Sequence, residues 1–152
     1  MAGVPGADER DPAALAGMHP GAVAKLDPAA GENPAQSVAL AASHGKLFGV
    51  QLNDGHAKLG AEDGLMFGTV HGHMAVEFLR WLQKVRFDGH IYFDTFPRNE
   101  DPVREAEFNI RRVKALWAKA AQLTAAGLDE HTRAHDAMGA MELLERMEAG
   151  VE

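Results

Sequence analysis

The chain has 152 residues, of which 46% are hydrophobic and 24% charged, a balance typical of a folded globular protein. Its net charge of −7 argues against a nucleic-acid partner, because 15 Lys and Arg residues against 22 Asp and Glu offer no basic face for phosphates. The absence of cysteine excludes disulfides and thiolate chemistry and favours a cytoplasmic location, and no apolar run approaches the roughly 20 residues of a membrane span.

The first 32 residues differ in composition from the rest of the chain. They are rich in Gly, Ala and Pro and show neither the period of a strand nor that of a helix. Such a stretch gains little by burial, so we expect residues 1–32 to be an irregular or disordered N-terminal segment. A short helix over Pro12–Met18 and a strand fragment over Ala22–Leu26 are the regular elements compatible with it.

A helix and a strand are predicted next. Asn33 is a good helix cap, and Pro34 occupies the first helical position, where its missing N–H costs nothing. The helix should run to about His44, because Gly45 can adopt the left-handed conformation that ends helices. The largely apolar run Lys46–Leu52 then predicts a strand buried on both faces.

After a polar connection over residues 53–73, the chain predicts a second helix and a second strand. One apolar stripe at helical spacing marks the helix: Ala75, Phe78, Leu79, Leu82 and Val85. The sequence "HIYFDT" predicts the strand over about His90–Thr95.

Two further helices complete the predicted order. Asp101 and Pro102 repeat the cap-and-proline opening, and apolar spacing continues to about Ala126 before Gly127. The last helix is expected over Asp129–Ala149. Strands that alternate with helices predict a parallel sheet with right-handed crossovers, but two strands alone do not make a stable one, so part of the fold is expected to be missing.

Polar side chains follow both predicted strands. Gln51, Asn53, Asp54 and His56 come at the end of the first strand, and Asp94 comes at the end of the second. In parallel α/β proteins, functional groups gather beyond the carboxyl ends of strands. Oxygen and imidazole ligands suit Mn²⁺, Co²⁺, Mg²⁺ or Zn²⁺. The alternative is that these residues only form turns, since Asn, Asp and Gly are common turn formers.

Two stretches resemble the C-terminal part of the xylose isomerase-like TIM barrels, and among these the sugar isomerases of the L-rhamnose isomerase type. They are "GENPAQSVALAASHGKLFGVQLNDGHAKLGAEDGLMFGTVH" and "GHIYFDTFPRNEDPVREAEFNIRRVKALW", within about Gly31 to Leu123. The resemblance implies a partial (β/α)₈ barrel, with the last two or so βα units in residues 33–126 and a C-terminal helix in residues 127–152. Since a complete barrel takes about 250 residues, the earlier strands are expected to be missing.

The resemblance also implies a metal site. Family members hold one metal with a Glu, an Asp, a His and a final Asp from four successive strands. Asp94 matches the final Asp, whereas Gln51 stands where the family has His, and a Gln carbonyl is a weaker donor than imidazole. Glu62 and Asp63 match acids that serve a second metal, with Asp54 also a candidate ligand. His56, Asn53 and His71 are the candidate substrate-binding residues.

These matches predict a divalent-metal-dependent aldose–ketose isomerase acting on a small-molecule sugar, in a copy that is truncated and lacks part of its site. One alternative is a non-catalytic barrel fragment that requires a partner or self-associates as a homo-oligomer through its sheet edge. Another is a sugar epimerase of the same superfamily. Related epimerases carry Glu at the last-strand position, and Asp94 is one methylene shorter. A metal-dependent phosphodiesterase ranks last because the chain is acidic.

Overall fold

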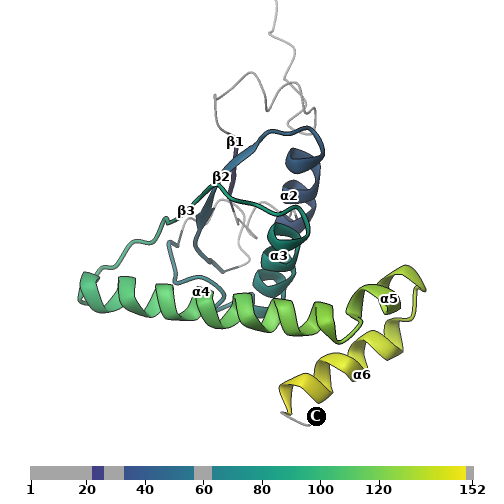
Figure 1. Ribbon diagram of the computed structural model, residues 1–152. Helices are drawn as coiled ribbons and strands as arrows, with labels where there is room; N and C mark the ends of the chain where they lie inside the picture. Colours follow the sequence, from purple (N-terminus) through teal and green to yellow (C-terminus); the bar gives the residue numbers. More distant parts are fainter. Residues whose placement is uncertain (1–21, 26–32, 57–62, 150–152) are drawn as a thin grey trace, which may run out of the picture.

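The computed structural model describes residues 22–25, 33–56 and 63–149, with residues 22–25 described by their backbone (Figure 1). Helices and strands alternate over most of this span, which confirms the mixed α/β class. The elements are β1 (Ala22–Lys25), α2 (Pro34–Ser43), β2 (Leu47–Leu52), α3 (Gly72–Lys84), β3 (His90–Phe93), α4 (Pro102–Ala125), α5 (Leu128–Arg133) and α6 (Ala137–Glu148).

The strands form one sheet of three strands in the order β1-β2-β3, and both pairs are parallel. The parallel pairing predicted for β2 and β3 is therefore confirmed, and β1 is a third strand, within the N-terminal segment that was expected to be mostly irregular. It matches the strand fragment over Ala22–Leu26, of which Leu26 lies outside the described residues. The helix considered over Pro12–Met18 also lies outside them.

The helix starts follow the predicted capping chemistry. Asn33 Oδ1 accepts hydrogen bonds from the backbone N–H groups of Ala35 and Gln36, at 2.8 and 3.4 Å. Asp101 Oδ1 accepts one from the Arg104 N–H at 2.9 Å. These bonds satisfy donors that a helix cannot satisfy internally, so local sequence alone sets where α2 and α4 begin.

The single helix predicted over Asp129–Ala149 is wrong, because the chain forms α5 and α6 with a turn between them. His135 adopts a left-handed φ of 55°, which ends α5. Asp136 then caps α6 by accepting the Gly139 N–H at 2.9 Å, and its other oxygen lies 2.8 Å from His131 Nδ1. Side-chain capping at Asp136 thus outcompetes the continuation of the helix.

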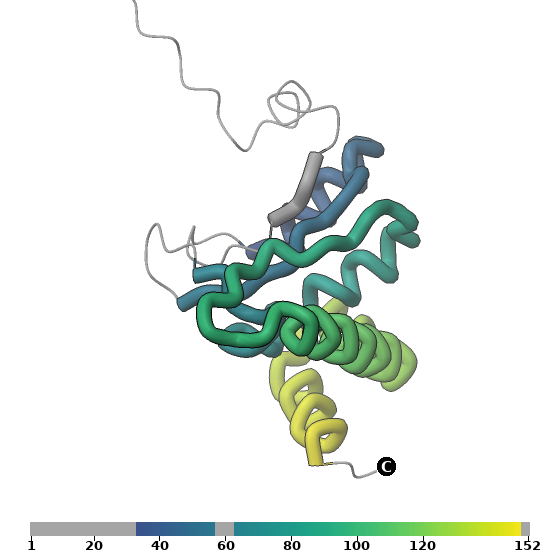
Figure 2. The backbone as a smooth tube through the Cα atoms, turned by 90° about the vertical axis from the view of Figure 1, so that its left-hand side faces the viewer, coloured from purple at the N-terminus to yellow at the C-terminus, as the bar shows by residue number. Residues whose placement is uncertain are grey.

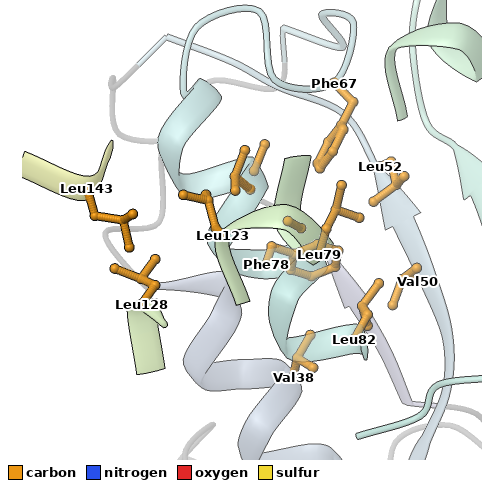
Figure 3. Close-up of a cluster of buried hydrophobic side chains, with 13 residues drawn as sticks. Val38, Val50, Leu52, Phe67, Phe78, Leu79, Leu82, Leu123, Leu128 and Leu143 are labelled. Atoms are coloured by element: carbon orange, nitrogen blue, oxygen red, sulfur yellow. The ribbon is translucent and has the colours of Figure 1, made fainter. Parts of the chain in front are cut away.

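Helices α2 and α3 cover one face of the sheet, and the core extends from β2 and these helices to the C-terminal part of α4 and to α5 and α6 (Figure 3). Val50 and Leu52 of β2 are fully buried there. The labelled members of this core are Val38, Val50, Leu52, Phe67, Phe78, Leu79, Leu82, Leu123, Leu128 and Leu143. No helix in the described residues has both the length and the hydropathy needed to cross a bilayer.

Helix α4 runs across the strands rather than beside them, and its N-terminal end extends past β3 (Figures 1 and 2). Its C-terminal half packs on α3: Gln83 donates its side-chain N–H to the Trp117 carbonyl at 2.9 Å. β3 is left less covered than β2, with Ile91 39% and Tyr92 42% exposed. The prediction that Lys46–Leu52 forms a strand buried on both faces is also wrong in part, because Phe48 of β2 is 51% exposed and Gln51 is half-buried.

Candidate functional site at the strand ends

The carboxyl ends of β2 and β3 lie side by side. The register pairs Gln51 with Tyr92 and Leu52 with Phe93, and the Asp94 N–H donates to the Leu52 carbonyl at 3.1 Å. The next residues along, Asn53 and Asp94, are therefore neighbours at the same end of the sheet. The juxtaposition expected of these two strand ends is present.

The same register decides which side chains share a face. Val50 and Leu52 face the helices, so alternation places Gln51 and Asn53 on the opposite face. Tyr92 pairs with Gln51 and takes that face too, and alternation from Tyr92 carries Asp94 to it. We call Gln51, Asn53, Tyr92 and Asp94 the strand-end cluster: two amides, a phenol and a carboxylate.

Within the strand-end cluster, Gln51 donates its amide N–H to the Tyr92 hydroxyl. The amide nitrogen of Gln51 is thereby engaged, and its carbonyl oxygen keeps acceptor capacity. Gln51, which stands where the resembling family has a His ligand, is thus a hydrogen-bond donor at the strand end. Tyr92 was missed from sequence, and the signal that could have found it is its position opposite Gln51 in a parallel register.

Asp54 has a different environment, buried on the far side of the strand end. Its Oδ1 accepts from the Gly55 N–H at 2.9 Å and lies 2.8 Å from His71 Nδ1. Its Oδ2 accepts from the N–H groups of Val70 and His71 at 2.8 and 2.9 Å. These four bonds occupy the roughly four acceptor positions of a carboxylate. A cation would have to displace one of them before Asp54 could bind it.

Electrostatics agree with this structural role. Burial raises the pKa of Asp54, but the hydrogen bonds from His71, Val70 and Gly55 lower it by more, so the net pKa lies below the ordinary value. Asp54 is therefore ionised at neutral pH and holds the start of α3 against the end of β2. His71, which the resemblance assigns to substrate binding, contacts Asp54 through its ring Nδ1 and its backbone N–H.

The remaining predicted residues lie in the connection between β2 and α3. Asp63 Oδ2 accepts a hydrogen bond from the His56 N–H at 2.8 Å, so Asp63 links two parts of this connection. An isolated antiparallel bridge between Asp54 and Leu65 holds the same turn. Glu62, the other predicted ligand of a second metal, lies outside the described residues.

The donor set falls short of a complete metal site. No group of three or more His, Asp or Glu side chains among the described residues is arranged to hold a metal ion. The strand-end cluster offers one carboxylate, two amides and a phenol, which suit a hard cation as partial ligands only. On their own, the described residues therefore do not make up a complete metal site.

Comparison with known proteins adds no assignment to this geometry. No protein-family model matches the chain, and no curated protein matches it.

Proposed function

We propose that this chain is the C-terminal segment of a xylose isomerase-like (β/α)₈ barrel, and that its strand-end cluster is part of the site of a divalent-metal-dependent sugar isomerase. The observation that carries the proposal is the parallel pairing of β2 with β3, which sets Asp94 beside Asn53 at one end of the sheet. Active sites of such barrels lie at that end of the strands.

The order of the elements supports a barrel segment over a doubly wound sheet. The strands follow each other in sequence order, β1-β2-β3, and α2 and α3 both lie on one face. A doubly wound sheet reverses its strand order and carries helices on both faces. In a barrel, the face opposite the helices is the interior, where the strand-end cluster lies.

The chain's own residues suit a polyol substrate. The Asp94 carboxylate and the Gln51 carbonyl are acceptors for sugar hydroxyl groups, whereas Asn53 is only 5% exposed and is less accessible to a substrate. A bound divalent cation would supply the Lewis acidity that polarises neighbouring sugar oxygens. Asp54 positions the connection that follows β2, because its four hydrogen bonds hold that connection and the start of α3 in place.

A titration with Mn²⁺ tests this proposal. The chain should bind Mn²⁺ weakly, since the described residues do not make up a complete metal site, and Asp94→Asn should weaken binding at least tenfold, or by about 1.4 kcal/mol. Glu107→Gln, at an exposed acid on α4, is the matched control and should leave the isotherm unchanged. An isotherm that Asp94→Asn leaves intact would overturn the role of Asp94.

Turnover is tested with the same proteins. Aldoses incubated with the chain and Mn²⁺ or Co²⁺ are assayed for ketose. Metal-dependent ketose that disappears in Asp94→Asn would establish an isomerase. Binding that depends on Asp94 without ketose from any aldose would identify a segment that needs further strands for catalysis. We also propose a cytoplasmic location, whether or not the chain is catalytic by itself, because it contains no cysteine.

A second candidate function is a non-catalytic barrel fragment that associates with other chains. The exposure of Ile91 and Tyr92 on the end strand β3 favours it, since parallel strands are normally covered on both faces. This candidate predicts that Mn²⁺ binding does not depend on Asp94 and that the chain is not monomeric.

A further inference from the structure

The connection between β2 and α3 is bonded to the chain beyond both strands. The Gly64 carbonyl accepts from the N–H of Phe96, shortly after the end of β3, at 3.0 Å. Gly64 has a left-handed φ of 59°, and a Cβ there would overlap the Phe96 ring. Further along, the Val70 and His71 N–H groups donate to Asp54, just after the end of β2. The stretch from Gly64 to His71 is therefore fastened beside both strand ends.

Between these two attachments, α4 holds the connection through a fully buried side chain. Asn109 is 0% exposed, and its Oδ1 accepts from the Phe67 N–H at 3.2 Å. Its Nδ2 donates to Glu105 Oε1, one turn earlier on α4, at 2.6 Å. Because a carboxylate can only accept, Glu105 requires the NH₂ of Asn109 on its side and leaves the amide oxygen for Phe67. A buried amide is costly unless it is bonded, so this orientation is strongly favoured.

A second residue of α4 holds the next position of the connection. Arg112 Nη2 donates to the Gly68 carbonyl at 2.5 Å. Gly68 has a left-handed φ of 71°, and a Cβ there would lie 2.9 Å from Leu116 Cδ1 and 3.2 Å from the Cβ of Ala75. The connection thus passes so close to α3 and α4 that it leaves no space for a side chain at this position.

We propose that Asn109 and Arg112 are positioning residues of the strand-end cluster, which they reach through the connection and Asp54. Helix α4 follows β3 in the chain, and it holds the segment that binds Asp54 after β2. It therefore braces the end of β2 against the end of β3 and sets the spacing of Asn53 and Asp94. The inference rests on the proposed function, in which that spacing determines how well a cation is held.

Substitutions on α4 test this role without changing the cluster. Glu105→Ala removes the acceptor that orients Asn109, whereas Glu105→Gln removes the charge and keeps an acceptor oxygen. Glu107→Ala, at a side chain that is 64% exposed, is the matched control. Asn109→Ala removes the bond to the connection itself, and Glu105→Ala decides the question if that variant does not fold. Arg112→Met is compared with Arg111→Met, at a side chain that is 68% exposed.

Amide hydrogen exchange of Val70 and His71 is the first measurement, because their N–H groups bond to Asp54 and not to α4. Relative to the N–H groups of β2, they should exchange about tenfold faster in Glu105→Ala, Asn109→Ala and Arg112→Met. Glu105→Gln and the two controls should exchange as the wild type does. Faster exchange confined to Phe67 would overturn the proposal, and so would equal effects of Glu105→Ala and Glu107→Ala.

The strand ends are measured by the backbone amide signals of Asn53 and Asp94 in nuclear magnetic resonance spectra without metal. These signals should shift in Glu105→Ala and Arg112→Met and should keep their wild-type positions in Glu105→Gln and the controls. Signals that stay in place in every variant would mean that α4 does not position the cluster.

Mn²⁺ separates this inference from the proposed function. Where the wild type binds Mn²⁺ through Asp94, Glu105→Ala should raise the dissociation constant about threefold, and Glu105→Gln should leave it unchanged. Equal affinities of the wild type and Glu105→Ala would overturn the positioning role. A wild type that does not bind Mn²⁺ would overturn the proposed function alone, because amide exchange and the metal-free spectra still decide whether α4 positions the strand ends.

Discussion

The β2–α3 and β3–α4 units have the same order of strand, acid-bearing connection and helix, yet they are held in different ways. In the first unit, Val50 and Leu52 are fully buried, and Asp54 holds four hydrogen bonds at the start of α3. In the second, Ile91 is 39% exposed, and the N-terminal end of α4 extends past the edge of the sheet. Among the described residues, the strand of the first unit is thus covered more completely than the strand of the second.

The difference teaches that an acid after a strand has no fixed role. The long connection after β2 folds back through the Asp54–Leu65 bridge and brings Val70 and His71 to Asp54. The short connection after β3 leads directly to Asp101, which caps α4 through the Arg104 N–H. The long connection after β2 thus folds around its first acid, whereas in the short connection after β3 Asp101 caps the next helix.

The two units should differ most in the free energy of unfolding that is lost when a strand side chain is truncated. Leu52→Ala removes a fully buried side chain and should lower the free energy of unfolding by about 3 kcal/mol. Ile91→Ala should lower it by about 1 kcal/mol, because Ile91 is already 39% exposed. Urea unfolding followed by circular dichroism measures both. Equal losses would mean that the strand of the second unit is covered as well as that of the first.

The next largest difference is expected in the free energy of unfolding that is lost when an acid of each unit is replaced. Asp54→Asn keeps the shape but puts an amide NH₂ against backbone and ring donors, and should lower the free energy of unfolding by about 2.5 kcal/mol. Asp101→Ala, which removes a cap held by one bond, should lower it by about 1 kcal/mol. The same urea titrations compare the two. A loss below 1 kcal/mol for Asp54→Asn would show that Asp54 does not organise the start of α3.

Lowering the pH should remove the contribution of Asp54 to the free energy of unfolding. Because its pKa is lower in the folded chain, its stabilisation is fully present above the ordinary value of 3.8 and is lost as pH falls through the folded-state pKa. The gap in stability between wild type and Asp54→Asn should therefore be constant at neutral pH and should narrow below pH 3.8. A gap that widens in acid would reverse the sign of the pKa shift. Asp129 and Asp136, whose pKa values are also lowered, are common to both proteins and cancel.

The smallest effect is expected in the strand-end cluster. Tyr92→Phe removes the hydroxyl that accepts from the Gln51 amide and should lower the free energy of unfolding by about 0.5 kcal/mol, since both side chains remain partly open to water. Nuclear magnetic resonance should show the Gln51 side-chain amide signals shifting. A stability loss as large as that of Leu52→Ala would mean that the cluster is part of the core.

Much of the fold was predictable from local sequence. Asn33 and Asp101 cap the helices that they were expected to cap, and the apolar stripe of α3 gives core residues such as Phe78 and Leu79. The break between α5 and α6 was missed, although Asp136 is itself a capping residue type, because the apolar spacing runs through it. The prediction from local sequence failed where two patterns, apolar helical spacing and a capping residue, favoured different structures.

The site was less predictable, because its contacts join residues far apart in the sequence. The adjacency of Asn53 and Asp94 followed from parallel pairing, which a strand–helix–strand order implies. The partners of Asp54 did not follow, since Val70 and His71 reach it only through the path of the connecting chain. Gln51 and Tyr92 required the exact register of the two strands.

The most direct test of the strand-end cluster locates Mn²⁺ by the broadening of backbone amide signals in nuclear magnetic resonance spectra. At low Mn²⁺, the signals of Asn53 and Asp94 should broaden first, those of α6 should stay sharp, and Asp94→Asn should abolish the effect. Broadening centred on other acids, or broadening at Asn53 that persists in Asp94→Asn, would contradict the placement of a cation between the ends of β2 and β3.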